Sequence, residues 1–72
     1  MSEALEASAR LLDDAAEHLD RAAAHCRVAA GHFRDNAIPR ATAHAWAAHG
    51  HVEEAVARLA EQARDHAAHS RA

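Results

Sequence analysis

Apolar side chains recur every seven residues through the first half of the chain. The main row of this series consists of Leu5, Leu12, Leu19, Cys26 and Phe33. Three residues further on, the chain carries a second row of small side chains, Ser8, Ala15, Ala22 and Ala29. Such a seven-residue period, with charged residues filling most of the remaining positions, is typical of an amphipathic α-helix. We therefore predict a first helix at about residues 3–35.

The second half of the chain repeats the pattern. Its main row is Ile38, Ala45, Val52, Leu59 and His66, and its small row is Ala41, Ala48, Ala55 and Gln62. Gly50 costs a helix about 1 kcal/mol relative to alanine, but the period continues across it without a shift. The pattern predicts a second helix at about residues 39–69.

A short turn at residues 36–38 separates the two predicted helices. Asn36 tolerates the left-handed conformation that commonly ends a helix. Pro39 is best accommodated in the first turn of a helix, and it disfavours helical angles at Ile38. A connection of this length joins antiparallel neighbours. The sequence thus predicts an all-α fold, in which residues 1–72 form a single antiparallel helical hairpin.

The position of the turn also predicts which residues face each other across the hairpin. Helices of equal rise that meet near Ala37 would place Leu19 opposite Ala55 and Leu59 opposite Ala15. Large side chains would then pack against small ones, and the helices would approach closely. The histidine series His18, His25 and His32 would face Val56, His49 and Thr42 in the same order.

Two helices cannot enclose a core between them, and chains of this size are only marginally stable. We therefore expect the hairpin to associate with a second copy as a homodimeric four-helix bundle, a non-enzymatic assembly or protein-interaction module. The expected contact residues are Leu11, His18, His25, His32, Trp46 and Val56. Trp46 lies among alanines on the outer side of the second helix, so it would contact the second copy or another protein.

A cluster of histidine and cysteine offers an alternative function. His25 would face His49, with Cys26 beside it, and imidazole and thiolate are ligands for zinc or copper. The same residues also fit a simple boundary between core and solvent, because the composition is typical of a GC-rich genome, which enriches alanine, arginine and histidine. His44 and His51, expected on the opposite edge, would with His49 form a pH-responsive or merely solvated surface.

Composition excludes several other classes of protein. A single cysteine rules out an intrachain disulfide, and no apolar stretch approaches the length of a membrane span. With no leader-like segment either, we expect a cytoplasmic protein. No catalytic or nucleotide-binding motif occurs, so we expect neither an enzyme nor an organic cofactor. The net charge of −3 makes nucleic acid an unfavourable partner, although Arg27, Arg34 and Arg40 near the turn leave a small nucleic-acid regulator as a second alternative.

Overall fold

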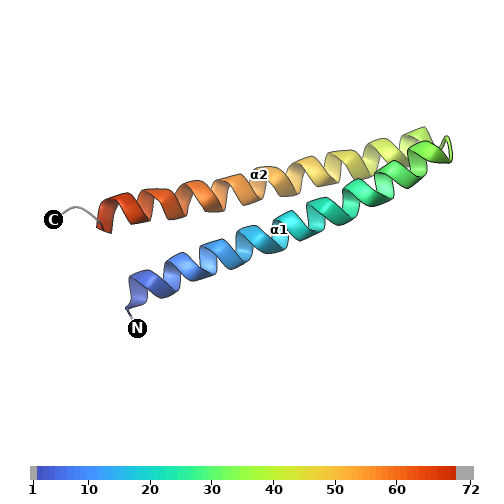
Figure 1. The fold of residues 1–72 in the computed structure, drawn as a ribbon. Coiled ribbons are helices and arrows are strands. Elements are labelled where there is room, and N and C mark those ends of the chain that lie inside the picture. Colours follow the sequence, from blue (N-terminus) through green and yellow to red (C-terminus); the bar gives the residue numbers. More distant parts are fainter. Residues whose placement is uncertain (1, 70–72) are drawn as a thin grey trace.

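The protein is a long hairpin of two antiparallel helices (Figure 1). The computed structural model describes residues 2–69 and consists of α1 (Glu3–Arg34) and α2 (Ile38–His69). The hairpin measures 57 × 18 × 11 Å, so it is a single layer of helices. The predicted all-α hairpin is confirmed. The predicted domain range also includes residues 1 and 70–72, which lie outside the described residues.

Local signals in the sequence explain where α1 begins. Ser2 has an extended backbone, and its Oγ accepts a hydrogen bond of 3.2 Å from the N–H of Leu5. This side chain satisfies one of the N–H groups that the first turn of a helix leaves unpaired. Glu3 and Glu6 place negative charge in the same turn, where it interacts favourably with the helix dipole.

The turn is closed by the backbone of Asn36, which has the only positive φ angle (59°) among the described non-glycine residues. Its N–H donates to the carbonyl of Phe33 at 3.0 Å, and the N–H of Ala37 donates to the carbonyl of His32 at 2.8 Å. These two bonds form a Schellman motif, which pairs carbonyls that the end of α1 would otherwise leave free. The left-handed conformation predicted for Asn36 is confirmed.

The helix boundaries differ from the predicted ones by one residue. Asp35 caps α1 instead of ending it, and α2 begins at Ile38 and not at Pro39. The reason is that the carbonyl of Ala37 already accepts the N–H of Ala41 at 3.0 Å. Pro39 then falls in the first turn of α2, where its missing N–H leaves no bond unmade.

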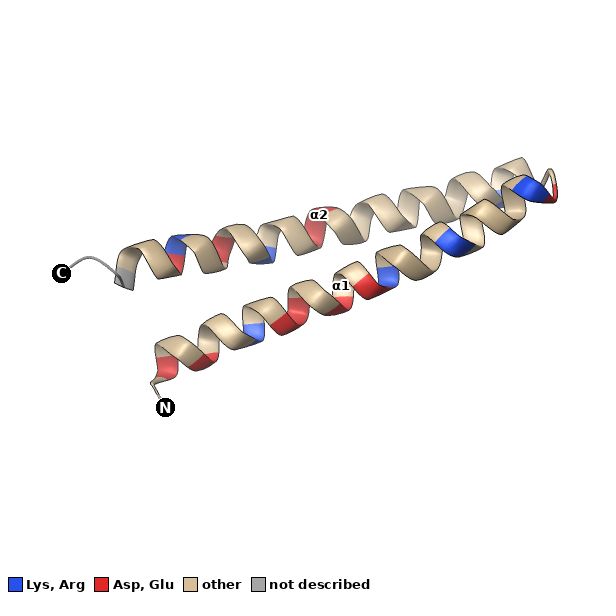
Figure 2. Ribbon diagram, viewed as in Figure 1, with Lys and Arg blue, Asp and Glu red and all other residues tan. Residues whose placement is uncertain are grey.

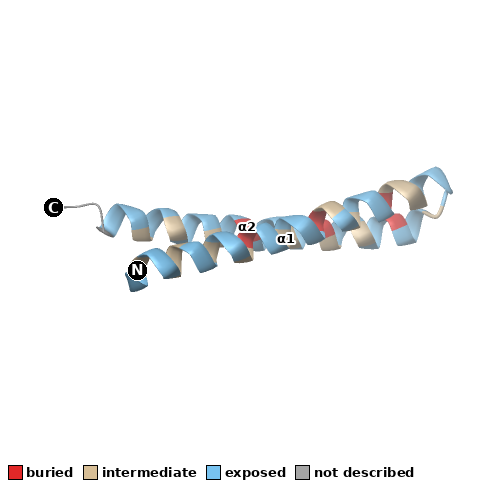
Figure 3. Cartoon of the chain, turned by 60° about the horizontal axis from the view of Figure 1, so that its bottom comes forward, coloured by how far each residue is buried: buried red, intermediate tan, exposed pale blue. Residues whose placement is uncertain are grey.

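Only alanines are fully buried between the helices. Among the described residues, the buried positions are Ala15, Ala22, Ala29, Ala41, Ala48 and Ala55, which we call the alanine seam. Figure 3 shows these positions as short buried patches between two helices that are otherwise exposed or half-buried. The small side chains allow the two backbones to approach closely.

The large side chains that were predicted to pack against alanines inside the hairpin are not buried there. Leu19 and Leu59, expected opposite Ala55 and Ala15, remain 45% and 43% exposed. Each helix carries an apolar surface that is wider than one partner helix can cover. The side of each helix that faces its partner is the alanine seam, not the row that contains Leu19 or Leu59. The large side chains are therefore displaced to one side of the contact.

Within residues 2–69, neither helix combines the length and the apolar character that crossing a membrane requires.

Candidate functional site

Five histidines line the contact between the helices and interdigitate. In order along the hairpin they are His18, His51, His25, His44 and His32, which we call the histidine ladder. All five are half-buried. Neighbouring rings in this order have centroids 5.2, 5.7, 5.2 and 5.5 Å apart. The ladder is thus a continuous series of imidazoles drawn from both helices.

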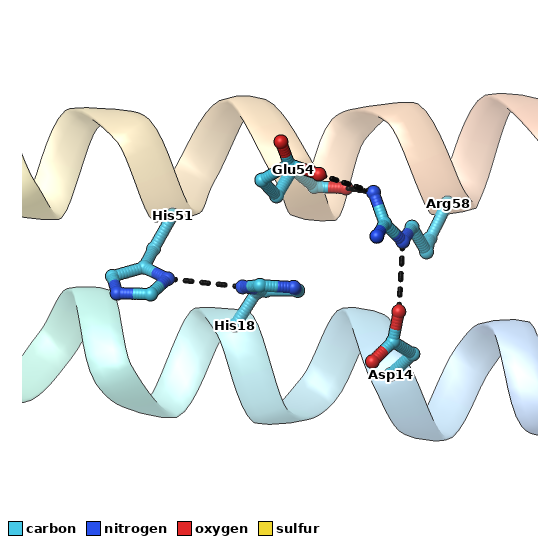
Figure 4. Close-up of polar contacts among 5 residues, drawn as sticks. All are labelled: Asp14, His18, His51, Glu54 and Arg58. Carbon is cyan, nitrogen blue, oxygen red and sulfur yellow. Dashed lines mark hydrogen bonds and ion pairs between the residues drawn. The ribbon is translucent and has the colours of Figure 1, made fainter.

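Two pairs in the ladder are joined by hydrogen bonds across the hairpin. Nδ1 of His18 lies 2.9 Å from Nδ1 of His51 (Figure 4), and Nδ1 of His25 lies 3.0 Å from Nδ1 of His44. In each pair one Nδ1–H donates and the other Nδ1 accepts, so each bond needs at least one neutral imidazole. The bonds are lost if both rings of a pair become protonated.

The surroundings of His51 favour its neutral form. Partial burial lowers the pKa of His51, and the nearby His18, Arg21 and His25 lower it further, while Glu54 acts in the opposite direction. Removing a charged imidazolium from water and placing it beside other cations both disfavour protonation. These surroundings therefore favour the form of His51 that can accept a hydrogen bond or bind a metal ion.

A charged cluster continues the contact beyond the ladder, towards the end where α1 begins. Nε of Arg58 donates to Oδ2 of Asp14 at 2.7 Å, and its guanidinium also pairs with Glu54 on its own helix (Figure 4). These hydrogen bonds raise the pKa of Arg58, so it stays charged. The pair links α1 to α2 at a separation of 44 residues along the chain.

The predicted metal group does not form. Within the described residues, no group of three or more His, Cys, Asp or Glu side chains converges closely enough to hold a metal ion. His25 pairs with His44, while Nδ1 of His49 lies 3.1 Å from Glu53 and its ring contacts the edge of Trp46. Cys26, expected in the core, is exposed.

His49 was expected to face His25, but it lies on a different side of α2 from the histidines that do so. His44 and His51 are seven residues apart and share one side of α2, but His49 is two residues from His51 and so lies about 200° round the helix from it. His44 and His51 were predicted on the edge opposite His18, His25 and His32, and the structure places them in the same series. His18 accordingly contacts His51, and His32 contacts His44.

The large apolar side chains form a second feature, exposed on the surface. We call Leu5, Leu12, Leu19, Phe33, Ile38, Val52 and Leu59 the apolar row. On α1, Ala22 lies between Cys26 and His25 round the helix, because its side chain is about 40° from the first and 60° from the second. The row and the ladder therefore flank the alanine seam on opposite sides. The helices are antiparallel and bury equivalent positions, so both contribute to the same row.

The expected contact residues fall into two groups. Leu11, His18, His25 and His32 are half-buried along the side of α1 that faces α2. Trp46 and Val56 are exposed at 67% and 58%. Trp46 also lines a shallow groove on α2 with Thr42, Ala45 and His49, and this groove borders the apolar row. The groove was not apparent from the sequence, although the alanines around Trp46 indicated an apolar surface.

Charge is divided unevenly along the hairpin. Figure 2 shows the acidic residues of both helices mostly in the halves remote from the turn. Arg27, Arg34 and Arg40 are exposed near the turn, where Asp35 is their acidic neighbour in the sequence. This arrangement keeps the arginines accessible to an anionic partner, as the second alternative requires.

Comparisons with known proteins assign no relationship to this chain. No protein-family model matches it, and neither a curated protein nor a solved structure gives a match. Its function must therefore be inferred from the apolar row and the histidine ladder themselves.

Proposed function

We propose that the protein is a non-enzymatic assembly module that forms a homodimeric four-helix bundle through the apolar row. One observation carries this proposal. The large apolar side chains of the row are 41–64% exposed, while the fully buried positions of the described hairpin are all alanines. Burying a leucine-sized side chain contributes about 1.5–3 kcal/mol, and a single hairpin leaves much of that contribution unused.

The surface area supports the same conclusion. The chain exposes 5312 Å², whereas a compact monomer of 7.7 kDa is expected to expose about 4,300 Å². The excess, about 1,000 Å², is comparable to the roughly 800 Å² that each partner buries in a specific interface. A second hairpin laid on the row would turn this thin layer into a bundle with an enclosed core.

A second copy is the partner that the row fits best. The row contains no charged residue, and Cys26 and Ala45 fill the positions between its members. A two-fold dimer brings the same surface of each protomer together, so apolar side chains would meet apolar side chains over its full length. Four helices packed in this way enclose a core of the kind that stabilises small helical bundles.

The test uses substitutions of closely matched exposure. Val52 in the row and Val28 on the ladder side are 41% and 44% exposed in the single hairpin. Leu19→Gln combined with Val52→Gln should convert a dimer to a monomer in sedimentation equilibrium at micromolar concentration. Val28→Gln should leave the dimer intact, because Val28 lies about half a turn round α1 from Leu19.

Tryptophan fluorescence provides a second reading of the same experiment. Trp46 is the single tryptophan of the chain and borders the row. Its emission should shift to shorter wavelength as the protein dimerises and should lose this shift in the double variant. A wild-type protein that sediments as a folded monomer would contradict the proposal. So would equal dimerisation of wild type and double variant.

A further inference from the structure

We propose that the histidine ladder contains two metal sites, His18 with His51 and His25 with His44, each of which binds one Cu²⁺ ion between α1 and α2. Both ligands of each site come from one chain. The ladder also lies on the side of the alanine seam away from the apolar row. Metal binding is therefore independent of the proposed dimer.

The nitrogen–nitrogen distances, which are those of hydrogen bonds, are also close to the distances between two ligands of one metal ion. The Nδ1 atoms are 2.9 Å apart in one pair and 3.0 Å apart in the other. With metal–nitrogen bonds of about 2.0–2.1 Å, two ligands at right angles lie about 2.8–3.0 Å apart and two at the tetrahedral angle about 3.3–3.4 Å. The observed spacing fits adjacent corners of a square plane, the arrangement that nitrogen ligands form with Cu²⁺ and Ni²⁺. Cu²⁺ heads the affinity order of the divalent ions at nitrogen sites.

Binding requires a change of tautomer but no loss of a proton from a neutral pair. In the metal-free pair one Nδ1 carries the hydrogen that it donates to the other. When Cu²⁺ binds, that ring transfers its proton from Nδ1 to Nε2, so both Nδ1 lone pairs become ligands and both rings stay neutral. Each ring must also rotate so that its lone pair points at the ion.

The surroundings of the ladder suit such a site. The five rings are half-buried, so water can reach each ion and complete its coordination. Arg21 on α1 and Glu54 on α2 interact with His51, and their opposite charges offset each other near the first pair. The charged groups of the adjoining layer, Asp14 and Arg58, are already paired with each other.

The central experiment compares two double variants of equal composition. His44→Gln with His51→Gln leaves His18, His25 and His32 on one helix, about 10.5 Å apart at 1.5 Å per residue, too far to share an ion. His49→Gln with His66→Gln removes two exposed histidines of α2 outside the ladder. Each protein, without a histidine tag, is titrated with copper(II) chloride at pH 7.5 by calorimetry. Circular dichroism first verifies the helix content.

Wild type and the His49/His66 variant should bind about two ions per chain, and Cu²⁺ should raise their melting temperature. The His44/His51 variant should lose both effects. Equal binding by the two variants would overturn the proposal, as would a wild type that binds no copper. If the His44/His51 variant does not fold, electron paramagnetic resonance of the wild-type protein with bound Cu²⁺ tests the proposed sites instead. Two coupled nitrogens per copper support the sites, and coordination by oxygen alone overturns them.

Discussion

Alanine fills the buried contact of this hairpin, whereas leucine, valine, isoleucine and phenylalanine line the surface beside it. The two regions differ in what they contribute. The alanine seam brings the backbones close and sets the geometry of the hairpin, but each buried alanine removes little apolar area from water. The apolar row holds most of the large side chains and, in the single hairpin, leaves about half of each exposed. In a small helical protein, the closest intramolecular contact therefore need not provide the largest hydrophobic contribution.

The largest expected effect is on the row. Leu19→Ala should lower the free energy of unfolding by about 2–5 kcal/mol, because the proposed dimer buries this side chain. Urea denaturation at a concentration where the protein is dimeric measures the loss. Arg10→Ala, at an exposed position of the same helix, should change it by less than about 0.5 kcal/mol. Similar small losses in both variants would show that the row stays exposed in solution.

The next largest effect concerns the alanine seam, where a side chain is enlarged instead of shortened. Ala55→Leu adds bulk at a fully buried position, so it should force the helices apart and destabilise the protein by about 1–3 kcal/mol. Ala57→Leu makes the same change at an exposed position of α2 and should be nearly neutral. Thermal unfolding of both variants distinguishes them. If Ala55→Leu is stabilising, the helices are not closely packed at the seam.

The smallest expected effect is the pH dependence contributed by His51. Its pKa is lower in the folded protein than the ordinary value of 6.5. As pH falls below about 6.5, the unfolded chain therefore binds more protons than the folded protein does. The folded protein should accordingly become less stable as pH decreases through that range. His51→Gln should make the denaturation midpoint less sensitive to pH between about 7.5 and 5.5, and His49→Gln should not. If wild type, His51→Gln and His49→Gln show the same dependence of the midpoint on pH, His51 does not contribute to it.

The turn and the helices were predictable because their signals are local. Asn36 and Pro39 act through the backbone angles that their own residues allow, and Ser2 caps through a bond to a residue three positions away. The seven-residue period likewise depends only on spacing within one helix. None of these features requires knowledge of the partner helix, so the sequence alone was sufficient to define them to within one residue.

The pairing of the histidines was not predictable from the same information. The period shows which residues share a side, but four adjacent rows of α1 are apolar, small or histidine, and any of them could face α2. In the structure each helix faces its partner with the alanine seam, so it is rotated relative to the predicted arrangement. As a result Cys26 is exposed, and the partner of His25 is His44 instead of His49. Only a signal from both helices together, such as the matching spacing of His18, His25 and His44, His51, could have indicated the ladder.

The single turn at Asn36 also affects how the hairpin folds. His32 and His44, near the turn, are 12 residues apart, whereas Asp14 and Arg58 are separated by 44. Bringing the more distant pair together first would cost about 1 kcal/mol more in loop-closure entropy. The contacts next to the turn should therefore form early. Each contact between α1 and α2 that has formed shortens the loop that the next contact must close. Folding along the hairpin then proceeds from the turn outward, and the charged layer of Asp14 and Arg58 is among the last to assemble.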